Sequence, residues 1–220
     1  LQYAANMRVG NELIGLPGLL GGSSELGVAT QRSEFGFRMP FAFDVGTGTG
    51  VIAAILAKRG VKKIIATELA SRALVCAKHN IQKLGYTEQV KIVGADLFPP
   101  TDAGLADLIV CNPPWLPVKA NSAIEHAVYD PGSQMLKGFL SGVKNHLALN
   151  GEAWLILSDF AEHLELRSAE ELQQWITEAG LRVVEKLDIE PKHGKASDTS
   201  DPLHKARSKE VTSLYRLRVE

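Results

Sequence analysis

The chain has 220 residues, 45% of them apolar and 22% charged, and its 24 basic and 25 acidic side chains leave a formal net charge of −1. This composition fits one globular domain and excludes a protein that binds nucleic acid through overall positive charge, although not a local basic patch. Its two cysteines are too few for a disulfide framework, and no apolar run reaches the roughly 18 residues of a membrane span, so we expect a cytoplasmic protein without a membrane segment.

The first 40 residues form no periodic pattern, because glycines interrupt each apolar run. For residues 1–40 we expect an irregular segment: a loop, a short helix, or the remnant of a substrate-recognition region. A regular pattern begins at Phe41, and we expect the main domain to span residues 41–220.

From Phe41 onward, short apolar strands alternate with amphipathic helices. Strands are predicted over residues 41–45, 63–67, 90–93, 105–111, 153–157, 181–189 and 211–219. Helices are predicted over residues 51–59, 70–84, 132–149 and 168–179, the last opened by a capping box of Ser168 and Glu171. This alternation predicts a doubly wound α/β sheet. The last two strands have no helical pattern between them, which allows an antiparallel pair.

In such sheets the ligand lies beyond the carboxyl ends of the strands, so the residues that follow each strand are the candidates. The first candidate is Asp44-Val45-Gly46-Thr47-Gly48-Thr49-Gly50, between a strand and a helix. Its Gly-x-Gly-x-Gly spacing differs from the dinucleotide fingerprint, and no Gly-Lys-Ser/Thr follows that would make a P-loop. The segment predicts a close approach of the backbone to a bulky ligand; the alternative is a glycine-rich turn without one.

Two acidic residues follow the next two strands. Glu68 lies 18 residues beyond Gly50, where a carboxylate can accept both hydroxyls of a ribose. A lone acid at a strand end is typically a solvated charge, but the glycine loop upstream favours the ribose contact. Asp96 could accept a hydrogen bond from the amine of an adenine, with Leu97 against the ring, or it could be a turn residue.

The segment Asn112-Pro113-Pro114-Trp115 follows the apolar strand that ends at Cys111 and is the most specific motif. Its prolines cannot continue a sheet ladder, so the chain must leave the sheet here. The Asn112 side chain and the Pro113 backbone offer two carbonyl acceptors for one NH₂ group, and Trp115 offers a flat face for stacking. The alternative is a rigid turn with a buried tryptophan.

Together these positions resemble the class I S-adenosylmethionine-dependent methyltransferases. Within that class they are similar to the amino-methylating group, which includes HemK-like protein-glutamine enzymes and the N6-adenine and N2-guanine methyltransferases. The resemblance extends over residues 41–220, and the segment 129–136 is similar to the Glu-Pro-x-x-Ala-Leu segment of HemK-like enzymes. It implies a Rossmann-like, mostly parallel seven-stranded sheet whose last strand is antiparallel.

The resemblance also implies the role of each motif: the loop 44–50 holds the methionine part of the cofactor, Glu68 the ribose and Asp96 the adenine. The implied cofactor-binding residues are Asp44, Gly46, Thr47, Gly48, Gly50, Glu68, Asp96, Leu97 and Asn112. The implied catalytic residues are Asn112, Pro113 and Trp115. No metal is expected, since Asp159, Glu162 and His163 have no second cluster at metal-ligand spacing.

For the acceptor we expect a planar nitrogen, with a nucleobase amine in RNA preferred. The segment 192–209 carries five basic residues against two acidic ones and could approach phosphates, although it could also be only a solvated loop. A protein glutamine is the alternative acceptor, weakened because the glycine-rich stretch of HemK-like enzymes is absent. Trp115 replaces the usual Tyr or Phe, from which we expect a differently shaped target pocket. Two other classes stay open: a non-catalytic docking module that keeps the cofactor pocket, and a nicotinamide-dependent oxidoreductase. The sequence predicts no oligomeric state.

Overall fold

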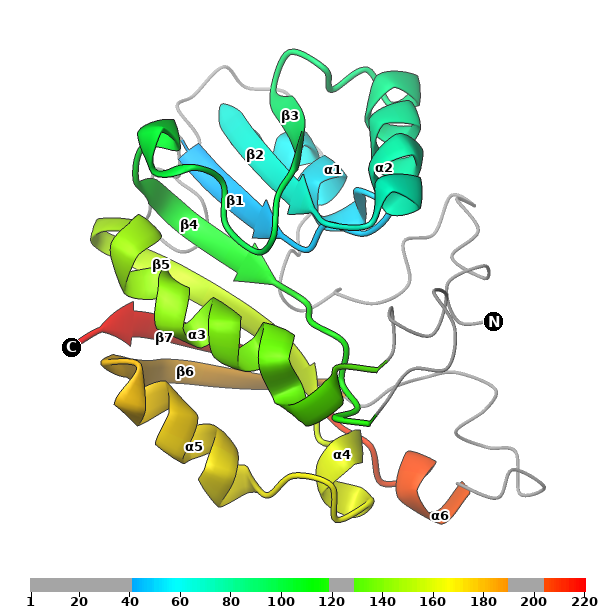
Figure 1. Ribbon diagram of the computed structural model, residues 1–220, viewed down its shortest axis with the longest axis vertical. Helices are drawn as coiled ribbons and strands as arrows, with labels where there is room; N and C mark the ends of the chain where they lie inside the picture. The colour runs from blue at the N-terminus through cyan, green and yellow to red at the C-terminus, as the bar shows by residue number, and fades with distance from the viewer. Residues whose placement is uncertain (1–40, 119–128, 190–203) are drawn as a thin grey trace, which may run out of the picture. The chain divides into compact units, whose positions relative to one another are not determined.

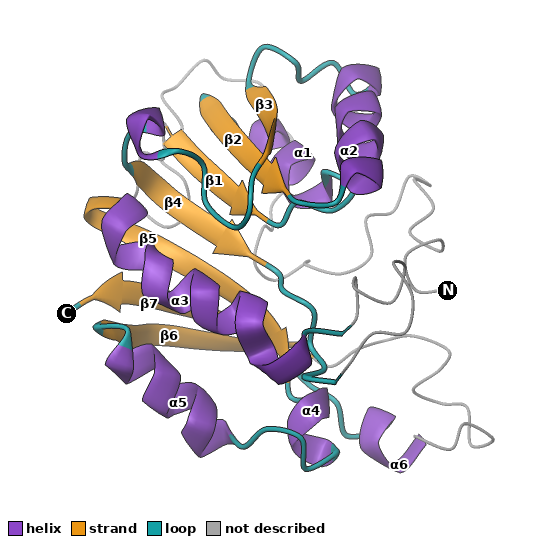
Figure 2. Cartoon of the chain, in the orientation of Figure 1, coloured by secondary structure: helices purple, strands orange, loops and turns teal. Residues whose placement is uncertain are grey.

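The computed structural model describes residues 41–118, 129–189 and 204–220. In this part of the chain a seven-stranded sheet has the order β3-β2-β1-β4-β5-β7-β6. The strands are β1 (Phe41–Val45), β2 (Lys63–Glu68), β3 (Val90–Gly94), β4 (Ala106–Cys111), β5 (Leu147–Ser158), β6 (Leu181–Ile189) and β7 (Thr212–Val219). The helices are α1 (Val51–Lys58), α2 (Ser71–Lys83), α3 (Gln134–His146), α4 (Phe160–His163), α5 (Ala169–Glu178) and α6 (His204–Arg207). Helices α1 and α2 cover one face of the sheet, and α3 and α5 cover the other (Figures 1 and 2).

The pairing confirms a doubly wound, mostly parallel sheet with an antiparallel last strand. β1 pairs in parallel with β2 and with β4, so Phe43 faces Ile65 on one side and Ile109 on the other. β7 is antiparallel to both β5 and β6. The strand order reverses between β1 and β4, and a ligand crevice is expected beyond the carboxyl ends of these two strands.

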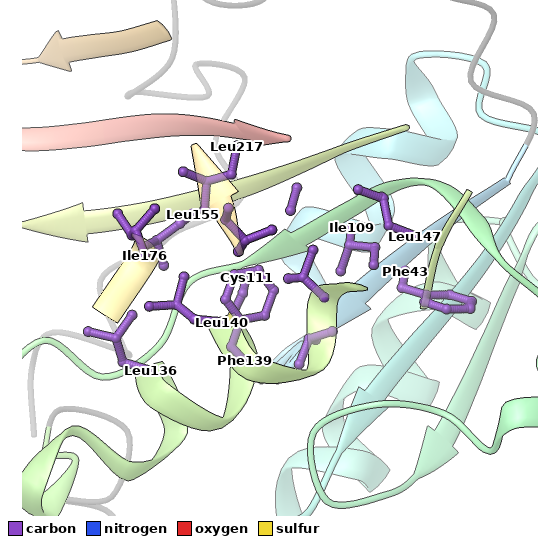
Figure 3. Packing of buried hydrophobic residues seen from close by; sticks show 14 of the residues in the cluster. Phe43, Ile109, Cys111, Leu136, Phe139, Leu140, Leu147, Leu155, Ile176 and Leu217 are labelled. Atoms are coloured by element: carbon purple, nitrogen blue, oxygen red, sulfur yellow. The ribbon is translucent and has the colours of Figure 1, made fainter. Parts of the chain in front are cut away.

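The main core lies between the sheet and α3 and α5 (Figure 3). The strands contribute fully buried residues such as Phe43, Ile109 and Leu155, and α3 contributes Phe139 and Leu140. The helical residues recur at the three- and four-residue spacing of an amphipathic helix, which is why the sequence pattern identified α3. This packing fixes the strand ends on which the candidate site is built.

The predicted helix over residues 132–149 is wrong at both ends. Residues Pro131–Ser133 form a 3₁₀ turn before α3, and the left-handed φ of 56° at Ser133 separates the two elements. At the other end α3 stops at His146, and Leu147 is already the first residue of β5, where it pairs with Ala106 of β4. Leu147 continues the apolar period because it is buried, although its backbone is extended. Strand β5 is therefore twelve residues long and not limited to 153–157.

Several expectations concern residues that the structure does not describe, including the irregular segment 1–40 and most of the basic segment 192–209. The capping box is present: Ser168 accepts the N–H of Glu171, and the Glu171 side chain accepts the N–H of Ser168. Across the described ranges, no helix has both the length and the apolar character that crossing a bilayer requires.

Candidate cofactor and acceptor site

Four of the predicted motifs follow four neighbouring parallel strands. The segment 44–50 begins with the last two residues of β1 and continues into the glycine loop after it. Glu68 ends β2, Asp96 follows β3, and the segment 112–115 follows β4. Parallel strands place their carboxyl ends at one edge of the sheet, so the fold brings these motifs to the same edge. The glycine loop and the segment 112–115 flank the point where the strand order reverses.

The glycine loop turns tightly through left-handed backbone conformations, with φ values of 69°, 57° and 85° at Gly46, Gly48 and Gly50. The N–H of Thr47 donates to the carbonyl of Thr67 at 2.8 Å, which ties the loop to β2. At Gly46 an added Cβ would lie 2.2 Å from Cε of Met135. Glycine is favoured there by the left-handed backbone conformation, whereas the Met135 methyl group is the flexible end of a side chain that can move.

Asp44 is a buried carboxylate with one unsatisfied oxygen. Its Oδ2 accepts hydrogen bonds from Thr47 Oγ1 at 2.5 Å and from the N–H of Ala53 at 2.9 Å, whereas Oδ1 is buried without a partner. Burial raises the pKa of Asp44 to about 6, and the charge of Glu68 adds to this effect. An unpaired buried acceptor is costly, so the group fits a cationic ligand such as the ammonium of a methionine moiety.

Glu68 closes the loop from the neighbouring strand. Its Oε2 accepts the N–H of Gly48 at 2.9 Å, and its Oε1 accepts the N–H of Ala70 at 2.8 Å. A carboxylate has about four acceptor positions, so each oxygen can accept one more bond, as a ribose diol requires. The next residue, Leu69, is 70% exposed, and this apolar side chain fits the face of a flat ligand. Leu69 was not among the predicted site residues, although an apolar residue directly after the acid was a usable signal for such a contact.

The residues after β3 contribute differently from what was expected. Asp96 is exposed at the edge of the sheet. Leu97 has a left-handed φ of 62°, and its carbonyl accepts a hydrogen bond from the hydroxyl of Thr67. The Leu97 side chain packs into the main core, with Cδ1 2.5 Å from where a Cβ on Gly138 would lie. It therefore faces α3, and the expected contact of Leu97 with a ring stays a prediction that this orientation does not favour.

The segment 112–115 leaves the sheet with Asn112 exposed and Pro113 buried. The indole N–H of Trp115 donates to Asn112 Oδ1 at 3.0 Å. This contact fixes the amide with its oxygen toward the indole, and the oxygen retains a second acceptor position. The sequence reasoning gave Trp115 a stacking role and missed the hydrogen bond, although a donor three residues after an asparagine was a usable signal.

Beyond the motif, Leu116 anchors the chain in a second, smaller core. Leu116 forms a parallel bridge with Tyr129, and it is buried together with Phe160 and Ala161 of α4 and Ala206 of α6. Helices α4 and α6 therefore lie next to the segment 112–115, and so does the chain that directly follows α6.

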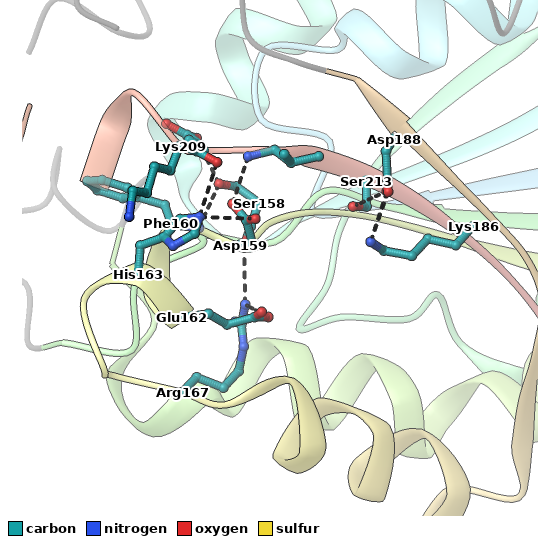
Figure 4. Close-up of polar contacts among 12 residues, drawn as sticks. Ser158, Asp159, Phe160, Glu162, His163, Arg167, Lys186, Asp188, Lys209 and Ser213 are labelled. Atoms are coloured by element: carbon teal, nitrogen blue, oxygen red, sulfur yellow. Dashed lines mark hydrogen bonds and ion pairs between the residues drawn. The ribbon is translucent and has the colours of Figure 1, made fainter. Parts of the chain in front are cut away.

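A polar cluster at the same edge joins α4 to the start of β7 (Figure 4). Asp159 accepts the N–H of Val211 at 2.7 Å, and His163 Nε2 lies 3.2 Å from Asp159 Oδ2 and 3.1 Å from the Lys209 carbonyl. These bonds account for Asp159 and His163 as structural residues. No group of three or more His, Cys, Asp or Glu side chains suited to a metal occurs within the described ranges.

Comparison with known proteins gives the site a context. Residues 38–180 match the family described as Methyltransferase small domain. The tRNA1(Val) (adenine(37)-N6)-methyltransferase of Shewanella putrefaciens is 24% identical over 161 residues, which are 70% of this chain and 65% of that protein. The release factor glutamine methyltransferase of Moorella thermoacetica is 36% identical over 78 residues, which are 35% of this chain and 28% of that protein. The chain thus spans less than two thirds of the length of these relatives.

The fold also matches solved structures. A SAM-dependent methyltransferase from Thiobacillus denitrificans, in complex with S-adenosyl-L-homocysteine, aligns with a TM-score of 0.56. The alignment covers 83% of this chain and 86% of that one at 14% identity. At this identity the likeness shows a shared fold, which agrees with the strand order described above.

Proposed function

The chain belongs to the methyltransferase small-domain family, and from that premise we propose that it is an S-adenosylmethionine-dependent N-methyltransferase acting on a planar amine or amide nitrogen. One observation carries the proposal. The glycine loop after β1 and the segment 112–115 after β4 lie on the two sides of the point where the strand order reverses. A cofactor loop and an amine-binding motif at that point can present a methyl donor to a nitrogen acceptor.

The residues at the sheet edge fit S-adenosylmethionine, which supplies a methyl group activated by a sulfonium. Asp44 would pair with the ammonium through its unsatisfied Oδ1, Glu68 would accept the ribose hydroxyls, and Asp96 would accept the adenine amine. The remaining proposed cofactor-binding residues are Gly46, Thr47, Gly48, Gly50, Leu97 and Asn112, with Leu97 contributing through its backbone.

The acceptor is oriented by Asn112 and Pro113. Hydrogen bonds from an NH₂ group to Asn112 Oδ1 and to the Pro113 carbonyl would hold the nitrogen with its lone pair toward the methyl group. These bonds strengthen as positive charge develops on the nitrogen, so they favour a pyramidal and more nucleophilic nitrogen. Trp115 stabilises the planar group by stacking and holds Asn112 through its indole N–H. The methylated nitrogen is cationic and readily releases its extra proton to solvent, so the chemistry needs alignment at about 3 Å and no strong base.

The preferred acceptor is a nucleobase amine in RNA. Trp115 offers a face for a base, and the second core places α6 beside Leu116, so Lys209, which is exposed, lies near the acceptor edge. The relative from Shewanella putrefaciens is named as a tRNA adenine-N6 enzyme, which supports this choice. A protein glutamine is the second candidate, because its side-chain amide also presents a planar NH₂ and a relative is named as a release factor glutamine methyltransferase.

The proposal is tested in two steps. Calorimetric titration with S-adenosylhomocysteine should show binding, while NADH, the control for an oxidoreductase, should show none. Transfer of a tritiated methyl group is then measured with RNA, DNA and protein pools. We expect Asn112→Ala to abolish transfer while its affinity for S-adenosylhomocysteine stays within threefold of the wild type, because Asn112 is only one of several proposed cofactor contacts and the glycine loop, Asp44 and Glu68 are unchanged in this variant. Binding without transfer to any pool would favour the docking module, and unchanged turnover in Asn112→Ala would contradict the mechanism.

A further inference from the structure

The buried residue Asp130 connects the chain that follows the acceptor motif to α3, through its backbone N–H on one side and its carboxylate on the other. Asp130 is 5% exposed, and its carboxylate accepts the N–H groups of Met135 at 2.9 Å and Leu136 at 3.1 Å, in the first turn of α3. Its own N–H donates at 2.7 Å to the carbonyl of Leu116, the residue after Trp115. Asp130 therefore links the chain that leaves the acceptor motif, through its backbone N–H, to the first turn of α3, through its carboxylate; the N–H of Gly132, which donates to the Pro117 carbonyl at 3.4 Å, supports the same connection.

Met135 extends the connection from α3 to the cofactor loop. Its Cε lies 2.2 Å and its Sδ 3.7 Å from the position that a Cβ on Gly46 would occupy, so the thioether rests directly on the loop backbone. Methionine is flexible and polarizable, and it fills such irregular spaces well. The start of α3 thus contacts the cofactor loop through Met135 and the acceptor motif through Asp130.

We propose that Asp130 and Met135 are positioning residues for methyl transfer: Asp130 sets the place of the acceptor motif on α3, and Met135 sets the place of the cofactor loop on the same helix. This inference rests on the proposed function, because it concerns the alignment of its two reacting groups. Displacement requires the nitrogen and the methyl group to be aligned at about 3 Å, and a misplacement of about 1 Å can cost about a hundredfold in rate.

The variants are chosen to separate position from stability. Met135→Ala removes the contact with Gly46, whereas Met135→Leu keeps most of the volume. Asp130→Ala removes both carboxylate bonds, whereas Asp130→Asn keeps an acceptor oxygen. Gln134→Ala is the matched control, since Gln134 is exposed in the same turn of α3. All assays are run at a temperature at which circular dichroism shows each variant to be folded.

The first measurement is the affinity for S-adenosylhomocysteine, which needs no acceptor. We expect Met135→Ala to bind at least fivefold more weakly, and Met135→Leu and Gln134→Ala to bind within twofold of the wild type. Equal affinity in Met135→Ala and the wild type would overturn the role of Met135. Absence of binding in the wild type itself would instead overturn the proposed function.

The second measurement addresses Asp130 through the indole N–H resonance of Trp115 in the protein bound to S-adenosylhomocysteine. We expect this resonance to move in Asp130→Ala, to return toward its original position in Asp130→Asn, and to stay unchanged in Gln134→Ala. With an acceptor in hand, kcat of Asp130→Ala should fall at least tenfold while KM for S-adenosylmethionine stays within threefold. An unmoved resonance, or lower thermal stability with unchanged kcat, would overturn the role of Asp130.

Discussion

At the scale of single residues, the candidate site holds a group whose burial destabilises the fold and for which we propose a role in cofactor binding. This group is Asp44, which is buried with one oxygen unsatisfied and whose pKa is raised to about 6. Its place at the end of β1 was predictable from the sequence, since a strand followed by alternating glycines is a strong local pattern. That Oδ1 of Asp44 has no hydrogen-bond partner was not predictable, because this depends on which groups the fold places around the carboxylate.

Asp44→Asn is expected to stabilise the protein and weaken cofactor binding. The folded-state pKa of about 6 lies above the ordinary value of 3.8, so the stabilising contribution of the protonated group is lost as pH rises through 6. The neutral amide avoids this loss, so the variant should be up to about 3 kcal/mol more stable at pH 7. Urea unfolding at pH 5 and pH 7 measures this difference in stability. The wild type should be more stable at pH 5 than at pH 7, whereas Asp44→Asn should not gain this stability.

The exposed Asp102→Asn is the matched control for this prediction, with no change expected in stability or in binding. Calorimetry should show that Asp44→Asn binds S-adenosylhomocysteine at least tenfold more weakly, since the ammonium loses its ion pair. A variant that is less stable than the wild type at pH 7 would contradict the assignment of Asp44 as a buried, unsatisfied charge.

Trp115→Phe keeps a flat face but removes the indole N–H that holds Asn112. A single hydrogen bond contributes about 0.5–1.5 kcal/mol, so kcat should fall about two- to twelvefold with the affinity for S-adenosylhomocysteine unchanged. Trp175→Phe on α5 is the control and should have no effect on kcat. Wild-type turnover in Trp115→Phe would show that stacking alone accounts for the residue.

At the scale of elements, α3 is shaped by two glycines that let the segment after β3 approach it. A Cβ on Gly142 would lie 2.2 Å from Phe98 Cε2, and one on Gly138 would lie 2.5 Å from Leu97 Cδ1. The apolar period predicted that this helix exists. It could not locate the C-terminal end of the helix, because the buried Leu147 continues the apolar period into β5. It also could not predict why glycine occurs at positions 138 and 142, because the side chains that contact these glycines are distant in sequence.

Gly142→Ala and Gly138→Ala should change the stability of the protein in different ways, although both replace a glycine of α3 by alanine. The Phe98 ring stacks on His146 with centroids 4.2 Å apart, so it cannot yield easily, whereas the end of Leu97 can rotate away. Overpacking costs about 1–3 kcal/mol and the change to alanine gains about 1 kcal/mol in a helix. Urea midpoints should therefore fall for Gly142→Ala and hold or rise for Gly138→Ala. Equal midpoints would show that Phe98 adapts freely.

At the scale of the whole molecule, an ion-pair network ties β5 to β7 on the face opposite α3. Glu152 accepts hydrogen bonds from Arg216 and Arg218, each at 2.7–2.8 Å in its shortest contact, and Trp154 also donates to it. Burial would raise the pKa of Glu152, but these bonds outweigh it and lower the pKa to about 2. The apolar pattern of the sequence predicted both β5 and β7. It did not predict that β7 lies between β5 and β6, because strand order depends on contacts between residues that are distant in sequence.

Glu152→Gln should lower the free energy of unfolding by about 1–3 kcal/mol at pH 7, because two arginines lose a charged partner. The lowered pKa means that the contribution of Glu152 is present above its ordinary value of 4.5 and is lost as pH falls toward 2. The difference between wild type and variant should thus be constant from pH 7 to 5 and shrink below about pH 4. Thermal melts over this range test it, with Glu88→Gln, which is exposed, as the control.

The position of β7 also constrains the order in which the molecule can be assembled during synthesis. Within the described residues β6 pairs only with β7, so residues 181–189 emerge as a strand with no partner to join. They must wait until residues 212–219 have been made and have entered beside β5. The cofactor half, β1 to β4, is complete far earlier. A ribosome that stalls late would therefore hold a nascent chain with its cofactor edge formed and one unpaired strand exposed, which is a recognised hazard for aggregation.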